Sequence, residues 1–76
     1  MGLTFDIEEH PERFRFRRGD AVVRRDDSDA SGIIVAGTRE EEGSRYVEVY
    51  DIERPDGKRF RAEDVELDLA RRMPLG

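Results

Sequence analysis

The stretch RYVEVYDIERPDGKRFRA, from Arg45 to Ala62, decides the fold because it encodes a β-hairpin. Residues 45–53 carry valine, tyrosine and isoleucine, which strands favour, in an alternating pattern. Residues 54–57, Arg-Pro-Asp-Gly, predict a tight turn, because proline fixes φ near the value of the second turn position and glycine accepts positive φ. Residues 58–62 alternate again and form the return strand.

The first strand of this hairpin has apolar groups on both faces. Side chains alternate along a strand, so Val47 and Val49 point to one face, and Tyr46, Tyr50 and Ile52 point to the other. This pattern favours a curved strand that is partly covered on each side.

Three earlier segments also read as strands: 13–17, 21–25 and 32–38. The first, RFRFR, predicts Phe14 and Phe16 facing the core and a comb of arginines on the outer face. Glycine inside the third segment indicates a bulge or a sharp bend. A polar turn over residues 26–32 and an exposed loop of three glutamates at 40–44 are expected on either side of it.

Residues 62–73 allow two interpretations. Val65, Leu67 and Leu69 alternate as in a strand, whereas Val65, Leu69 and Met73 have helical spacing, with acids early and arginines late. We favour a single 3-10 turn near residues 62–64 followed by a short strand.

The chain has 76 residues, which is enough for one domain. We divide it into a partly ordered arm at residues 1–12, a β-domain at 13–69 and a tail at 70–76. It has no cysteine, no apolar run of membrane-spanning length and no signal-peptide pattern, so we expect a cytoplasmic protein without membrane contacts.

Five short segments resemble the SH3-like barrels of the KOW and Tudor kind: GDAVV at 19–23, GII at 32–34, YVEV at 46–49, DGK at 56–58 and AEDVEL at 62–67. The resemblance covers about residues 16–69. It implies an all-β fold, a small five- to six-stranded antiparallel SH3-like barrel with a short 3-10 turn before the last strand. Such barrels are mostly binding modules for nucleic acid, ribosomal partners or peptides.

Reactive groups are scarce. There is no cysteine nucleophile, and the single histidine, His10, lies beside a proline in the irregular arm. No glycine-rich phosphate loop and no histidine cluster for zinc is present. We therefore expect no enzymatic activity, no cofactor and no small-molecule substrate.

The polar segment 26–32 contains the opening of a calcium loop. Asp27, Asp29 and Ser31 occupy the first, third and fifth positions of that motif, but Thr38 stands where a bidentate carboxylate is needed. We predict a solvated turn and no metal site, with these three residues as the only weak candidate ligands.

Charge is abundant and unevenly distributed: 43% of the residues are charged and the net charge is −5. Residues 13–25 hold six arginines against one acid, while residues 26–53 hold nine acids against two arginines. The basic segments either pair with these acids across the sheet or face an external anion. A nucleic-acid surface would use residues 58–61 and six arginines, Arg13, Arg15, Arg17, Arg18, Arg24 and Arg25.

We predict a non-enzymatic binding module that acts through protein–protein interaction or homodimerisation. Tyrosine and arginine are frequent anchors of protein interfaces. The predicted partner-binding residues lie on the two hairpin strands: Tyr46, Glu48, Tyr50, Arg59 and Arg61. Nucleic-acid binding through the arginine-rich face is the alternative.

Overall fold

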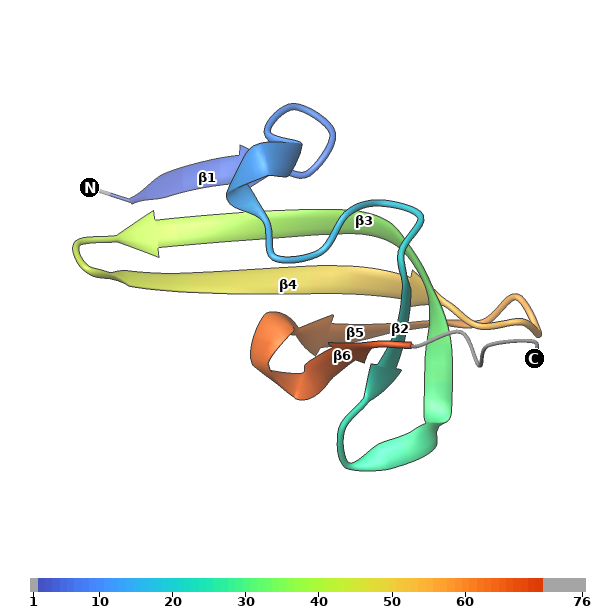
Figure 1. The fold of residues 1–76 in the computed structure, drawn as a ribbon. Helices are drawn as coiled ribbons and strands as arrows, with labels where there is room; N and C mark the ends of the chain where they lie inside the picture. The colour runs from blue at the N-terminus through green and yellow to red at the C-terminus, as the bar shows by residue number, and fades with distance from the viewer. Residues whose placement is uncertain (1, 71–76) are drawn as a thin grey trace, which may run out of the picture.

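The structure, a computed structural model, describes residues 2–70, which form six strands and two 3-10 turns. The elements are β1 (Leu3–Asp6), η1 (Pro11–Arg13), β2 (Ala21–Arg24), β3 (Asp27–Glu42), β4 (Arg45–Glu53), β5 (Arg59–Glu63), η2 (Asp64–Glu66) and β6 (Leu67–Leu69). Every strand pairing is antiparallel, in the order β5-β4-β3-β2-β6, and β1 pairs with β3 (Figure 1). The all-β prediction is confirmed.

The predicted hairpin is formed by β4 and β5. Its turn is closed by the N–H of Gly57, which donates to the carbonyl of Arg54 at 2.9 Å, and Gly57 has a φ of +88°. Asp56 accepts the N–H of Lys58 at 2.9 Å. The composition of residues 54–57 therefore located this turn correctly.

β3 is much longer than predicted, because the acidic segments at both of its ends belong to the strand. Its first part pairs with β2 and its second part with both β1 and β4. The register shifts between Ile34 and Ala36, so the irregularity lies just before Gly37 and not at it. The polar turn expected at 26–32 and the loop expected at 40–44 shrink to short turns, since neighbouring strands satisfy the backbone of those residues.

β4 extends past β5. The pairing between the two covers only Val49 to Glu53 of β4, so Arg45–Glu48 has no strand beside it on that side within residues 2–70. On its other side β4 pairs with β3 along its whole length, and the two form the long projecting hairpin in Figure 1.

The expected closed barrel is corrected to a curled, open sheet. β5 and β6 lie at the two ends of the strand order, and in the described residues no ladder joins them. η2 separates them and is held by a capping box, in which the N–H of Glu63 donates to the side chain of Glu66 at 2.9 Å. The 3-10 turn followed by a strand is confirmed, two residues later than predicted; Met73 of the helical alternative lies outside the described residues.

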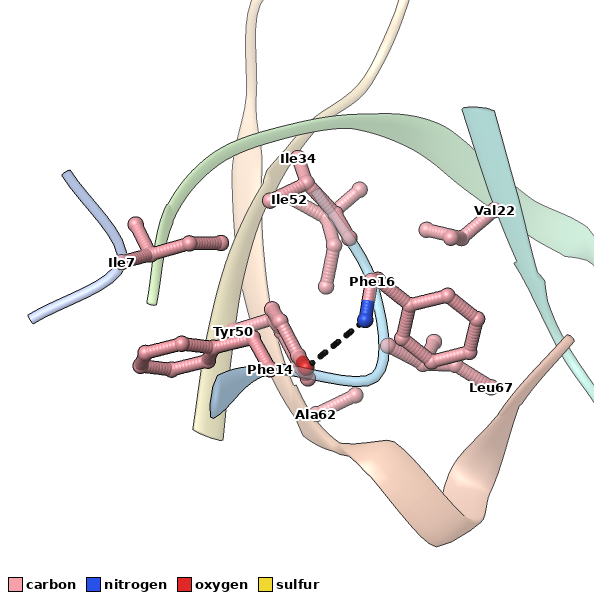
Figure 2. Close-up of a cluster of buried hydrophobic side chains, with 9 residues drawn as sticks. All are labelled: Ile7, Phe14, Phe16, Val22, Ile34, Tyr50, Ile52, Ala62 and Leu67. Atoms are coloured by element: carbon pink, nitrogen blue, oxygen red, sulfur yellow. Dashed lines mark hydrogen bonds between the residues drawn. The ribbon is translucent and has the colours of Figure 1, made fainter. Parts of the chain in front are cut away.

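The core lies inside the curl of the sheet (Figure 2). Its members are Ile7, Phe14, Phe16, Val22, Ile34, Tyr50, Ile52, Ala62 and Leu67. Phe14 and Phe16 are buried as predicted, but residues 14–17 do not form a strand. Instead, the N–H of Arg15 donates to Glu48 Oε1 at 3.0 Å and that of Phe16 to the Tyr50 hydroxyl at 3.2 Å. Side chains of β4 thus replace the strand ladder that the alternation suggested.

Glu48 is the buried polar centre of the fold, with only 2% of its surface exposed. It accepts three hydrogen bonds, from the Tyr50 hydroxyl, the Arg39 guanidinium and the N–H of Arg15. Arg39 in turn stacks on the Tyr46 ring, with 3.8 Å between Cζ and the ring centroid. This network fastens the segment before β2 to β3 and β4.

Burial, and then the hydrogen bond to Glu48, raise the pKa of Tyr50 well above its ordinary value. The folded state therefore keeps this proton at a pH where the unfolded chain loses it. The contribution of this proton to the free energy of unfolding is fully present below pH of about 10. It falls as the pH rises further, by about 1.4 kcal/mol per pH unit for one proton.

Urea unfolding between neutral and strongly alkaline pH measures this slope. Tyr50→Phe is expected to remove most of it and Tyr46→Phe to retain it; equal slopes in both variants would contradict the assignment.

Candidate interaction surface

The sheet has one face on the core and one face uncovered. Glu48, Tyr50 and Ile52 point inward and are buried, so alternation places their neighbours in β4 on the opposite side. We call this second side the outer face and define it by Thr4, Asp6, Ala36, Thr38, Glu40, Glu42, Arg45, Val47, Val49, Asp51, Arg61 and Glu63. All twelve side chains are exposed or half-buried.

The strand register arranges these residues in rows across the sheet. One row runs through Thr4, Glu40 and Val47. The adjacent row of the same face runs through Asp6, Thr38, Val49 and Glu63. A third row pairs Asp51 with Arg61, whose Nε lies 2.8 Å from Asp51 Oδ1.

Two hollows meet on this face. One, of about 610 Å³, reaches from Gly2 and Thr4 to Val47, and the other, of about 200 Å³, reaches from Val47 to Arg61. They share Glu40 and Val47. The larger hollow also reaches Leu3, Glu41 and Tyr46, which lie in a row of the opposite side. Val47, which is 44% exposed, lines both hollows, and we call the two together the channel.

The predicted partner-binding residues do not lie together. Arg59 and Arg61 are exposed on β5, beside Glu53 at 3.9 Å and Asp51 at 2.8 Å. Tyr46 is half-exposed, but it lies on the same side of β4 as the core residues.

Glu48 and Tyr50 are corrected from surface residues to core residues, because they are 2% and 0% exposed. The sequence showed Tyr46, Glu48 and Tyr50 on one face of a strand but did not show that the segment before β2 would cover two of them. A partner cannot reach Glu48 or Tyr50 in this fold.

The residues that sequence reasoning missed form the pattern Arg45, Val47, Val49, Asp51. It was visible as the second apolar face of the hairpin strand. The two tyrosines drew attention to the opposite face, since large aromatic residues are typical both of interfaces and of cores.

The three arginines of the predicted comb are exposed, and the phenylalanines between them are buried, but the segment that carries them is not a strand and each arginine contacts its own chain. Arg15 donates to the carbonyl of Asp64 at 3.2 Å and Arg17 to that of Phe14 at 3.1 Å. Arg13 packs on the Phe5 ring, with 4.4 Å between Cζ and the centroid. Two of these guanidinium groups thus bind backbone carbonyls of their own chain, and all three serve the fold.

The other arginines of this segment pair with carboxylates. Arg18 binds Glu8, which lies in the connection after β1. Arg24 lies 3.0 Å from Glu66, and Arg25 lies 3.0 Å from Asp68. The intramolecular pairing of basic and acidic segments, left open by the sequence, is therefore the arrangement seen for these three residues.

The acidic residues near the β2–β3 turn form no obvious ion site. Asp27 and Asp29 lie within β3, and Asp27 accepts the N–H of Asp29 at 3.0 Å. Residues 2–70 contain no group of three or more His, Asp or Glu side chains placed to hold a metal ion. In the same part of the chain, no helix has the length and apolar character needed to cross a membrane.

A further hollow of about 630 Å³ lies where β2, β3 and the β4–β5 turn meet. Its lining is largely apolar and includes Ile33, Val35, Pro55 and the last described residue, Ala70. Ile33 is 44% exposed, the same fraction as Val47. It therefore provides a matched reference position away from the channel.

Comparisons with models of protein families, with curated proteins and with solved structures found no match.

Proposed function

We propose that this chain is a non-enzymatic protein-interaction module and that its outer face is the binding surface. The observation that carries the proposal is the channel centred on Val47 and Val49, where apolar side chains stand uncovered between charged ones. Apolar groups surrounded by polar residues are typical of protein-binding patches.

We also propose that the fold is related to the SH3-like barrels. In support, the chain forms six antiparallel strands with a 3-10 turn before the last strand, which are two of the features that the resemblance implies. This relation supports a binding role at the level of the fold only, because one fold hosts many functions.

A non-enzymatic role agrees with the state of the two most unusual polar groups. Glu48 is surrounded by three donors, and Tyr50 is fully buried. Neither is accessible to a substrate, so a general acid or base would have to be sought among exposed carboxylates in ordinary surroundings.

Nucleic-acid binding is less well supported, because carboxylates of the same chain already neutralise Arg18, Arg24 and Arg25. Contacts to phosphate would have to replace these ion pairs. We place this function among the outcomes of the test below.

Site-specific photo-crosslinking tests the proposed function. A benzophenone amino acid replaces Val47 in one variant and Ile33 in the other, and the adducts formed in cells expressing the chain are identified by mass spectrometry. We expect discrete protein adducts from position 47, at least about tenfold more abundant than from position 33. Equal labelling from both positions, or no protein adduct at all, would contradict the proposal.

Fluorescence anisotropy with a labelled single-stranded DNA oligonucleotide tests the alternative. We expect no binding at low salt. Binding that weakens with salt, with a slope of log affinity on log salt of about −4, would correspond to six phosphate contacts and would favour the arginine residues instead.

A further inference from the structure

We infer that the occupant of the outer face is a second copy of this chain, packed face to face with β4 antiparallel to β4 of its partner. The inference rests on the proposed function and names the partner. It follows from the order of charges and apolar groups along the strand.

The outer face of β4 is complementary to a second copy of itself that runs antiparallel. In chain order it presents Arg45, Val47, Val49 and Asp51, which are basic, apolar, apolar and acidic. When two such strands are superposed antiparallel with Glu48 at the centre, Val47 faces Val49 and Arg45 faces Asp51. Both matches occur twice, as a two-fold axis requires.

The neighbouring strands match under the same axis. The two-fold axis runs midway between the two facing sheets, parallel to the sheets and perpendicular to the strands. It places β3 over β3 of the partner and β1 over β1 of the partner. Because Glu40 shares a row with Val47, and Thr38 with Val49, each Glu40 faces a Thr38. In the same way Thr4 faces Asp6. Glu40 and Asp6 therefore each face a hydroxyl group that can donate to them, while Glu63, beside Val49 on β5, lies at the edge of the contact and faces no residue of the partner's β5.

The ends of the strand carry the charge complementarity. Asp51 already contacts Arg61 at 2.8 Å, and Arg45 is exposed. In the paired arrangement Arg45 approaches Asp51 from the opposite sheet, so that the carboxylate lies between two guanidinium groups. Pairing in the parallel direction would instead place Arg45 on Arg45 and Asp51 on Asp51, which like-charge repulsion opposes.

The size of the face sets the expected affinity. Arg45 to Asp51 spans about 20 Å of strand, and the three strands that overlap in the pair, β1, β3 and β4, span about 10 Å, which gives about 200 Å² of flat sheet area per chain. This area is well below that of stable interfaces and allows only weak, transient association. We therefore expect a concentration-dependent dimer.

Sedimentation equilibrium of the full chain between about 10 μM and about 1 mM tests the inference, since a small interface predicts dissociation within that range. Val47→Asp is expected to raise the dissociation constant at least about tenfold, because it places a charge at the centre of the apolar contact. Ile33→Asp is the matched control, with the same exposed fraction in the wild type, and is expected to leave the dissociation constant unchanged. Circular dichroism verifies that each variant is folded.

A charge exchange provides a second, independent readout. Arg45→Asp and Asp51→Arg are each expected to weaken the dimer, and the double variant R45D/D51R to restore it, because the exchange recreates both complementary pairs. The exposed Asp51–Arg61 pair is expected to contribute little to folding, so Asp51→Arg remains testable.

A wild-type chain that stays monomeric at the highest concentration, equal effects of Val47→Asp and Ile33→Asp, or failure of the double variant to recover would each overturn self-association. If the chain is monomeric and position 47 still crosslinks to other proteins, the inference fails and the proposed function stands. If there is neither a dimer nor a protein adduct, both fail.

Discussion

Replacing Glu48 with alanine is expected to lower the free energy of unfolding by about 3–5 kcal/mol, the range observed when one partner of a buried charged pair is removed. The change deprives the Tyr50 hydroxyl, the N–H of Arg15 and the Arg39 guanidinium of their common acceptor. A chain of this length has a total stability of about 4–11 kcal/mol, so the expected loss is a large fraction of the whole. Urea unfolding followed by circular dichroism measures the change.

Glu48→Gln separates the loss of charge from the loss of shape. Glutamine can accept from the Tyr50 hydroxyl with its remaining carbonyl oxygen, so the expected loss is smaller, about 1–3 kcal/mol. Glu40→Gln, at an exposed position of the neighbouring strand, is the surface control and is expected to change stability by less than about 0.5 kcal/mol. Losses of similar size at positions 48 and 40 would show that the buried network does not contribute as described.

Gly32→Ala is expected to destabilise the fold by about 3 kcal/mol through overpacking. A Cβ at position 32 would lie 2.7 Å from Cγ2 of Ile52 and closer still to the carbonyl oxygen of Glu53. The backbone oxygen cannot turn away as a flexible side chain could, so β3 and β4 would have to separate where they begin to pair.

Gly2→Ala is the matched control for this substitution. Its Cβ would meet only the carbonyl oxygen of Glu41, at 3.4 Å, which is an ordinary contact. We expect thermal unfolding of the Gly2 variant to match the wild type and the midpoint of the Gly32 variant to fall by roughly 10 °C or more. Equal midpoints would show that the two strands can adjust at position 32 without cost.

The sequence predicted the elements whose signals are local. The turn chemistry of residues 54–57 defined the β4–β5 hairpin, and the alternation of residues 65–69 favoured a strand over a helix. The burial of Phe14 and Phe16 was also predicted, but their backbone conformation was not. Alternation reports which side chains face the core, whereas the hydrogen bonds of Arg15 and Phe16 go to side chains more than thirty positions away.

Long-range effects also explain the errors at the candidate surface. The polarity of residues 27–31 and 40–42 predicted loops, because isolated acidic runs favour solvent; pairing with neighbouring strands made both part of β3. Glu48 was predicted to bind a partner because it lies between Tyr46 and Tyr50 on the hairpin strand, but carboxylates can be buried when they are paired. Its partner Arg39 lies on β3, and the local sequence of β4 does not predict that pairing.

β4 is longer than β5, so the backbone N–H and C=O groups on that side of Arg45–Glu48 have no strand partner within residues 2–70. Such an open border is a template on which identical chains can stack without limit, as they do in amyloid. A charged side chain on such a border opposes this stacking, and Arg45 lies at the start of the open segment, where copies on successive chains would repel one another.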